Sequence, residues 1–248
     1  MAAGALGKAY DATWGRLFAS FYDRGLKATE ENGLRDMRAA LLADARGRVV
    51  EIGAGTGVNL DLYGAGIEDL TLVEPDQHMG AKLRARLDSR SAAATSDRRD
   101  ADSEDIAEPG AESAADADPA SPAPTRLVTA PAEALPFEDD TFDTAVATLV
   151  LCTVPDPVAA ITELARVLKP GGRLLFIEHV RSDDPHRARW QDRLEKPWRF
   201  LADGCHCNRA TEANLRASSF QIEAIDHGKL PKSPPIVRPL IRGTAILT

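Results

Sequence analysis

The sequence predicts an α/β fold in which a mostly parallel sheet is covered by helices on both faces. Short apolar runs typical of buried strands alternate with segments of helical periodicity, and a glycine-rich turn directly follows the first run. The chain of 248 residues has 44% hydrophobic side chains, enough for the core of one such domain. Because parallel strands need long crossovers, the alternation favours strands joined through helices.

The chain divides into an N-terminal segment and a main domain. The segment, residues 1–46, is expected to be helical, because apolar and aromatic side chains recur near every 3.6 residues over residues 10–45. Gly47 ends that pattern, and the main domain is expected over residues 47–248. It begins with a strand at residues 48–52, where the run RVVEI is typical of a buried strand.

The remaining elements are placed by apolar periods and turn residues. Pro75 suits the first turn of a helix, and the run K-P-G-G from Lys169 to Gly172 ends another helix before a strand. The further strands are expected at residues 70–73, 126–130, 142–150, 173–178, 220–226 and 242–247. The helices of the main domain are expected at residues 57–63, 75–86, 157–168, 185–201 and 211–217.

Residues 88–124 interrupt this rhythm. They contain ten acidic residues and three arginines, no aromatic residue, and only Ile106 as a large aliphatic side chain. Such a segment cannot bury enough apolar area to offset its ordering entropy, so we expect a disordered acidic insertion. It holds most of the net charge of −8. The rest of the chain has no basic stripe, and we expect no nucleic-acid partner.

Cysteine usage and the first residues favour a cytoplasmic protein. The three cysteines lack the even number and spacing of a disulfide framework. Residues 1–8 have no basic segment followed by an apolar run, so we expect no secretory signal. No apolar stretch is long enough to span a bilayer, and we expect no membrane anchor.

The segment EIGAGTG, residues 51–57, carries the clearest functional signal. Glycines between a strand and a helix permit a tight turn and a close approach of backbone to ligand. Glu74 ends the next strand about 20 residues later, where a carboxylate can accept hydrogen bonds from ribose hydroxyls. A nicotinamide-dependent oxidoreductase is the rival interpretation, but the third glycine of its fingerprint would fall at Val58.

The segment VVEIGAGTGVNLDLY resembles motif I of class I methyltransferases that use S-adenosylmethionine (SAM). The resemblance continues through LTLVEPDQHM, APAEALPFEDDTFDTAVATLVLCTVPDP and ITELARVLKPGGRLLFIEHV, and covers roughly residues 48–180. It implies a Rossmann-like class I methyltransferase fold, a seven-stranded sheet with a reversed last strand. It also implies SAM as cofactor and a small-molecule acceptor.

The resemblance also implies which residues hold SAM. The glycines would line its methionine and ribose part, Glu51 would orient the amino end, and Glu74 would hold the ribose. Pro131 stands where the family often has an acidic residue, which leaves the backbone of Ala132 to meet the adenine. Met79 would pack against adenine, although a helix methionine is more often core filler. The implied cofactor residues are Glu51, Gly53, Gly55, Gly57, Glu74, Met79, Ala132, Glu133, Thr148 and Leu149.

The C-terminal third is similar to the thiol S-methyltransferases of the methyltransferase-like group, which methylate alkyl thiols. The similarity lies in FIEHVRSDD, WRFLADGCHCNRATEANLRASSF and VRPLIRGTAIL. His179, just after the fifth strand, is the candidate that accepts the thiol proton, and Asp203 the candidate that orients a base or stabilises a cation. A structural imidazole and a turn aspartate are the alternatives.

Two alternatives stay open at this point. A second resemblance, carried by AEALPFEDDTFD and RVLKPGG, is to ubiquinone and menaquinone methyltransferases, so a quinone precursor could be the C- or O-methylated acceptor. A non-catalytic SAM-binding module is another.

Cys205, His206 and Cys207, with Cys152 distant, do not complete a usual zinc spacing, and we expect no metal site.

Overall fold

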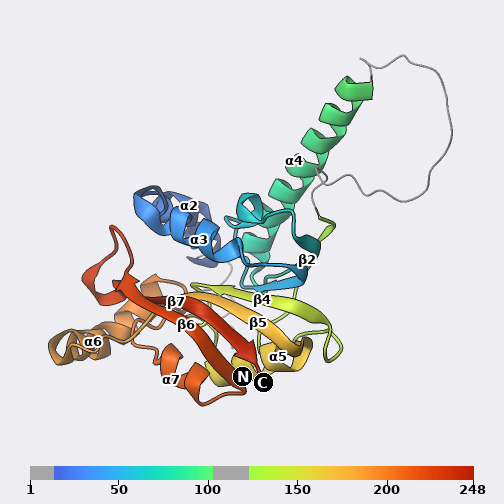
Figure 1. The fold of residues 1–248 in the computed structure, drawn as a ribbon. Helices are drawn as coiled ribbons and strands as arrows, with labels where there is room; N and C mark the ends of the chain where they lie inside the picture. The colour runs from blue at the N-terminus through green and yellow to red at the C-terminus, as the bar shows by residue number, and fades with distance from the viewer. Residues whose placement is uncertain (1–13, 103–122) are drawn as a thin grey trace.

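The computed structural model describes residues 14–102 and 123–248, which form a seven-stranded sheet of order β3-β2-β1-β4-β5-β7-β6 (Figure 1). Strands β1 to β5 are parallel, and β7 is antiparallel to both of its neighbours. The strands are β1 Gly47–Ile52, β2 Ile67–Val73, β3 Thr125–Val128, β4 Phe142–Thr148, β5 Leu168–His179, β6 Phe220–Lys229 and β7 Pro239–Leu247. The expected seven-stranded, mostly parallel sheet with a reversed strand is confirmed.

Two apolar clusters cover the two faces of the sheet. Val50 and Ile52 of β1 face one cluster and Val49 faces the other, because successive side chains of a strand point to opposite faces. The first cluster includes Ile161 of α5 Pro157–Val167, and the second includes Leu83 of α4 Gln77–Asp102. Helices therefore cover both faces, which leaves the carboxyl edge of the parallel strands as the place for a ligand.

The remaining helical elements join these layers. They are α2 Arg16–Thr29, a π-helical turn η2 Glu30–Leu34, α3 Arg35–Leu42, the 3-10 turns η3 Leu60–Leu62 and η4 Pro235–Val237, α6 Pro185–Leu201 and α7 Thr211–Arg216. The bounds of α6 are those that the sequence predicted. In the part of the chain that the structure describes, no helix combines the length and the apolar character needed to cross a membrane.

The N-terminal helical segment is broken rather than continuous. Asn32 and Gly33 leave helical geometry, Gly33 with a φ of 126°, and the chain turns there from α2 into α3. The expected helix at residues 57–63 is also wrong, since only the short turn η3 forms there. The glycine loop is therefore followed by a short 3-10 turn and not by a long helix.

Helix α4 is longer than expected and begins later. The side chain of Asp76 caps it by accepting hydrogen bonds from the backbone N–H groups of His78 and Met79, so the helix starts after Pro75 rather than on it. It ends at Asp102 instead of Arg86, so residues 88–102 are helical and not irregular. In Figure 1 its later turns project away from the sheet. The rest of the expected insertion, residues 103–122, lies outside the described residues.

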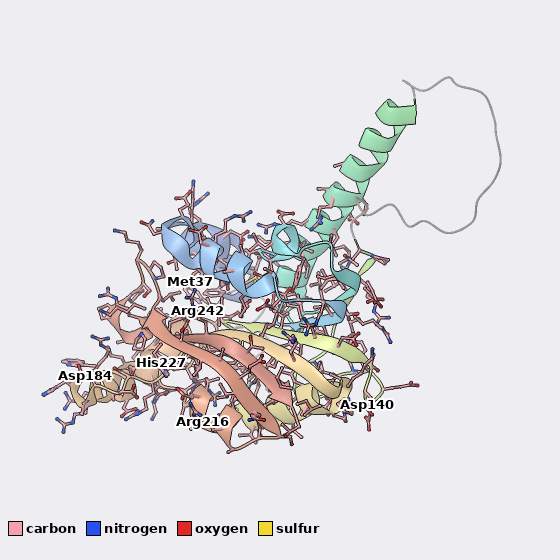
Figure 2. All side chains as sticks on the ribbon, viewed as in Figure 1. Met37, Asp140, Asp184, Arg216, His227 and Arg242 are labelled. Atoms are coloured by element: carbon pink, nitrogen blue, oxygen red, sulfur yellow. The ribbon has the colours of Figure 1, made fainter. Side chains whose placement is uncertain are left out.

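The start of β5 differs most from the expected strand bounds. The run Lys169 to Gly172 belongs to β5, and the pairing of β4 with β5 shifts register there, so it bulges the strand instead of preceding it. Strand β6 is an edge strand that carries His227, and its neighbour β7 carries Arg242 (Figure 2). Arg242 pairs with Asp226 across these two strands at 3.1 Å.

Candidate functional site

The glycine loop after β1 packs against the loop after β4. Gly53, Gly55 and Gly57 all have positive φ, a conformation that L side chains rarely adopt. A Cβ atom on Gly53 would lie 2.2 Å from Cγ2 of Val150, so no other residue fits there. A Cβ on Gly55 would meet nothing closer than the Gly53 carbonyl at 3.9 Å. The open side of Gly55 is where a ligand can approach the backbone.

Glu74 fixes this loop from the end of β2. Its two carboxylate oxygens accept hydrogen bonds from the N–H of Gly55 at 2.7 Å and of Asp76 at 2.8 Å. Burial raises the pKa of Glu74, although these backbone donors oppose the rise, and the charges of Asp76 and Asp203 add to it. The predicted ribose carboxylate therefore also positions the glycine loop.

Glu51 is the second buried carboxylate of the site. It accepts hydrogen bonds from the Asn59 side-chain amide at 2.8 Å and the Tyr63 hydroxyl at 2.6 Å. Burial raises its pKa to about 6, against the effect of these two donors and of the Arg38 guanidinium. A carboxylate held in this way is ready for a cationic group, because a positive partner would favour its charged form.

Arg38 joins the N-terminal helices to the sheet. It is 2% exposed and donates to the Thr148 hydroxyl at 2.6 Å and to the Asn59 side-chain oxygen at 3.2 Å. It also pairs with Glu30 at 3.2 Å. Asn59 donates in turn to Thr148 at 3.0 Å. Thr148 and Glu51, both predicted cofactor residues, are thus linked through Arg38 and Asn59.

Helix α2 lies against the glycine loop and the start of α4. Asp23 accepts a 2.6 Å hydrogen bond from the Thr56 hydroxyl and pairs with Arg86 at 3.3 Å. Lys82 donates to the carbonyl of Ala19. Before this helix, Trp14 stacks on Phe200 of α6, with ring centroids 6.2 Å apart. The N-terminal segment therefore spans the site from α4 to α6.

Two buried side-chain nitrogens, Nε1 of Trp14 and Nε2 of His78, have no hydrogen-bond partner among the described residues. A Cβ on Gly15, next to Trp14, would lie 3.8 Å from the His78 ring and 3.9 Å from the Asp76 carboxylate. The His78 ring therefore lies beside Asp76, in the loop that Glu74 holds. Buried polar atoms without partners are costly, and a bound ligand with polar groups can supply the missing bonds.

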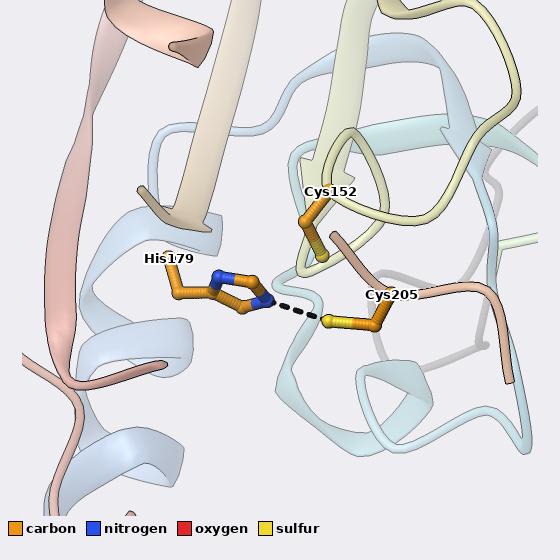
Figure 3. Close-up of side chains that lie close together, drawn as sticks. All are labelled: Cys152, His179 and Cys205. Atoms are coloured by element: carbon orange, nitrogen blue, oxygen red, sulfur yellow. Dashed lines mark hydrogen bonds between the residues drawn. The ribbon is translucent and has the colours of Figure 1, made fainter. Parts of the chain in front are cut away.

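The most distinctive cluster lies at the carboxyl ends of β4 and β5. Cys152, His179 and Cys205 bring one sulfur, one nitrogen and one sulfur within 4.8 Å of one another. The Nε2 atom of His179 lies 3.0 Å from the Cys205 sulfur (Figure 3). The Nδ1 atom of His179 is buried and has no partner among the residues described. The neighbouring Cys205 sulfur and burial raise the pKa of the Cys152 thiol well above its usual value.

Glu178, the residue before His179, holds the loop that carries Cys152. Its carboxylate accepts from the N–H groups of Val150 at 2.9 Å, Leu151 at 2.8 Å and Cys152 at 3.3 Å. Burial raises its pKa to about 7 against these three donors. Glu178 therefore has a structural role, and His179 remains the candidate that accepts the thiol proton.

Tyr22 and Asp203 border the same cluster. Burial raises the pKa of Tyr22 to about 12, and the sulfurs of Cys152 and Cys205 are among the groups that add to the rise. Asp203 has a φ of 47° and precedes Gly204, whose φ is 90°, in the turn after α6. Asp203 thus occupies a turn, as its alternative interpretation held, but that turn also carries Cys205 to His179.

The other predicted cofactor residues lie in different places along the carboxyl edge of the parallel strands. Met79 is 7% exposed in the first turn of α4, and Ala132 is also buried. The Glu133 carboxylate accepts a 3.0 Å hydrogen bond from the N–H of Asp156, which ties it to the start of α5. Leu149 has a φ of 57°, a strained conformation for a branched side chain, directly after β4.

Sequence reasoning missed Arg38 and Asn59, and it did not bring Cys152 and Cys205 together with His179. Arg38 carried a signal, because it lies four residues after Leu34 and three before Leu41, on the apolar face of its helix. Cys152 lies shortly after β4 and His179 ends β5, and the carboxyl ends of adjacent parallel strands lie at the same edge of the sheet, which also predicts proximity. Nothing in the local pattern near Cys205 shows that its turn reaches them.

Comparison with known proteins gives matches over most of the chain. A family model described as a methyltransferase domain matches residues 26–218. The thiol S-methyltransferase TMT1A of Homo sapiens is 38% identical over 109 residues, 44% of this chain and 45% of that protein. TMT1B of Homo sapiens, also named a thiol S-methyltransferase, is 30% identical over 211 residues, 83% of this chain and 73% of that protein. The match to TMT1A thus spans less than half of that relative.

Among solved structures, one similar fold is a SAM-dependent methyltransferase of Thermotoga maritima, described as a possible histamine N-methyltransferase. The two chains share 19% sequence identity at a TM-score of 0.59, over 94% of this chain and 97% of the other. At this identity the similarity concerns the fold alone.

Proposed function

The chain belongs to the methyltransferase-domain family, and we propose that it transfers the methyl group of SAM to the sulfur of a small thiol. The membership confirms the resemblance found in the sequence. The acceptor is supported by one observation above the others: the polar groups gathered beside the glycine loop, at the ends of β4 and β5, are Cys152, His179 and Cys205. The names of the two human relatives point to the same acceptor class.

The residues present fit SAM. Gly55 offers backbone with no side chain in the way, and Glu74 and Glu51 offer carboxylates to a ribose and to an ammonium group. The unpartnered Nε2 atom of His78 belongs to a ring that lies near the Glu74 end of the site. Bound SAM supplies a sulfonium methyl group that is already activated for transfer. The protein therefore has to position the acceptor and ionise it.

His179 supports the ionisation step. A thiolate is the nucleophilic form of a thiol, and a neutral imidazole can accept the proton that the thiol loses. The side chain is buried beside two sulfur atoms, away from bulk water. Asp203 stays a proposed positioning residue, since the turn that it begins holds Cys205 against His179.

A quinol precursor is the alternative acceptor. The shared segments AEALPFEDDTFD and RVLKPGG support it, but they lie away from the cluster and specify SAM chemistry in general. A non-catalytic SAM-binding module is the alternative without chemistry. These possibilities differ in which product forms, so a product assay separates them.

The test is methyl transfer by the purified chain. Labelled SAM is incubated with a panel of alkyl thiols, quinol precursors, phenols and amines, and the products are identified by mass spectrometry. The proposal expects a methyl thioether and an equal amount of S-adenosylhomocysteine. Methylation of a quinol precursor alone would contradict the thiol acceptor. SAM binding without any product would contradict the activity.

We also propose a cytoplasmic location. All three cysteines are free, as is usual in a reducing compartment. Cell fractionation with an antibody against the chain measures this. Recovery in the membrane pellet, resistant to washing at high salt, would contradict it.

A further inference from the structure

We propose that Cys152, His179 and Cys205 form the protein ligands of a zinc ion, whose fourth position takes the acceptor thiol. The inference rests on the proposed function for the identity of that fourth ligand. The metal site itself rests on the geometry of the three side chains. Sequence spacing argued against zinc because it considered the neighbours Cys205 and Cys207, and the fold brings together a different set.

The three donor atoms have the separation that a common ion requires. They lie within 4.8 Å of one another, and the shortest contact, from His179 Nε2 to Cys205 Sγ, is 3.0 Å. Zinc binds thiolate at about 2.3 Å and imidazole at about 2.0 Å, so tetrahedral ligands lie ~3.5–3.8 Å apart. Small side-chain rotations bring the three atoms to that spacing. Figure 3 shows the three side chains converging on one point.

The polar atoms of this cluster are poorly satisfied without an ion. Cys152 and His179 are 2% and 4% exposed. The Cys152 sulfur is 3.5 Å from the Thr153 hydroxyl, a weak contact. It also contacts the Cys205 sulfur, and hydrogen bonds between thiols are weak. Coordination of a cation by two thiolates and the Nε2 atom of His179 would replace these weak contacts with strong ones.

The surroundings fit a thiolate ligand. The indole N–H of Trp198 donates to the Cys205 sulfur at 3.3 Å, and donors to sulfur are typical outer partners of metal-bound thiolates. Glu178 fixes the loop of Cys152 through three backbone N–H groups. The two cysteines therefore come from restrained positions. A Cys₂His set is one of the known ligand sets of catalytic zinc, in which three protein ligands leave one position open.

Zinc in this position explains how a thiol would become a nucleophile. A thiol that binds zinc loses its proton to solvent and remains as a thiolate ligand. The thiolate sulfur then forms a bond to the methyl carbon of SAM. The bond from that carbon to the sulfonium sulfur breaks, and its electron pair stays on the sulfur of S-adenosylhomocysteine. No oxidant or reductant is consumed, and His179 acts as a ligand instead of a base.

The first experiment measures the metal directly. The full chain is purified without chelator, and its metal content is determined by plasma mass spectrometry. The expected result is about one zinc per chain in the parent. The variants Cys152→Ser, Cys205→Ser and His179→Ala should lose it. The matched control is Cys207→Ser, because Cys207 is buried and bonds the Gln191 carbonyl, outside the cluster. It should keep the metal.

The second experiment needs no variant. Chelated protein is reconstituted with cobalt(II), whose visible spectrum reports tetrahedral geometry and thiolate ligands. Addition of a short alkyl thiol should change this spectrum, because the thiol enters the fourth position. The same titration in the presence of S-adenosylhomocysteine measures binding without turnover.

Three outcomes overturn the inference. Metal-free protein that methylates thiols at the full rate rejects zinc but leaves the proposed function in place. Copper or iron in place of zinc rejects the identity of the ion. A cobalt spectrum that alkyl thiols do not change rejects the open position. By contrast, zinc binding with a thiol-sensitive cobalt spectrum supports the site, and a failure of methyl transfer in that same protein counts against the proposed function alone.

Discussion

The Arg38 guanidinium donates a 2.6 Å hydrogen bond to the hydroxyl of Thr148, which ends β4. This bond joins a helix of the N-terminal segment to the carboxyl edge of the sheet. Through Asn59 it continues to Glu51, at the edge where the cofactor is proposed to bind. The N-terminal segment is therefore part of the site, and changes in it should alter both stability and SAM binding.

Replacing Arg38 tests this link. Arg38→Met keeps apolar bulk but removes the Arg38 hydrogen bonds to Thr148 and Asn59 and the ion pair with Glu30. Removing one partner of a buried ionic network typically costs about 3–5 kcal/mol. Urea unfolding should show this loss, and calorimetry should show weaker SAM binding. Arg35→Met, on the exposed side of the same helix, is the control and should change neither. Equal stability of the two variants would contradict the link.

Glu74→Gln should weaken SAM binding. The substitution keeps the size of the side chain but removes its charge and one of its two acceptors, which hold Gly55 and Asp76. Loss of a charge-assisted hydrogen bond costs about 1.5–3 kcal/mol, or roughly 10- to 150-fold in affinity. Calorimetric titration measures it, with the exposed Glu68→Gln as control. Affinity equal to that of the parent would reject the ribose role.

Glu51 should make the free protein less stable as the pH rises. Its pKa is about 6 in the folded chain against an ordinary 4.5, so folding favours the protonated form. Its stabilising contribution is complete below pH 4.5 and is lost as the pH rises through 6, a change of about 2 kcal/mol. Glu51→Gln should remove this dependence and stabilise the SAM-free protein at pH 7.5, as thermal melts across the pH range would show.

The same carboxylate should give SAM binding the opposite dependence. The charged form of Glu51 is the one that attracts the SAM ammonium group, so affinity should fall as the pH drops through about 6. Glu51→Gln should bind SAM more weakly at pH 7.5 and show no such fall. A parent affinity that stays constant between pH 5 and 7.5 would contradict the assignment.

His179→Asn should reduce thiol methylation by roughly 10²-fold or more, with SAM affinity nearly intact. If His179 is a base, raising the pH should partly rescue the variant, because solvent then ionises the thiol. If His179 is a zinc ligand, the loss should persist at high pH and follow the loss of metal. His227→Asn is the control, since His227 lies on the edge strand β6 and pairs there with Glu212 of α7, outside the cluster. Unchanged turnover in His179→Asn would make that histidine structural.

Shortening the acidic insertion should leave the enzyme working. Residues 95–121 would be replaced by a short Gly-Ser linker, which keeps the contact of Arg90 with Asp61 and the packing of Leu87 and Ala123. Closure entropy depends weakly on loop length, so thermal stability and SAM binding should change little. A large fall in melting temperature would show that the removed part docks on the domain.

The sequence by itself determined the sheet and the cofactor loop. Strand and helix periods are local, which is why the sequence located the seven strands and α6. The spacing of Gly53, Gly55 and Glu74, directly after two adjacent strands, supported the SAM prediction. Element ends were less well determined. The K-P-G-G run bulges β5, because pairing with β4 decides where that strand begins. Helix α4 begins after Pro75, because the side chain of Asp76 caps it.

Only the tertiary structure decided which polar groups meet. Arg38 and Thr148 are 110 positions apart, and His179 and Cys205 are 26 apart, so no local pattern fixes their contact. Buried polar side chains take the partners that the packed helices and loops bring to them, because an unpaired polar group in a core is costly. The sequence could therefore name His179 and Cys205 separately, but only the packing of the turn after α6 against β5 placed them side by side.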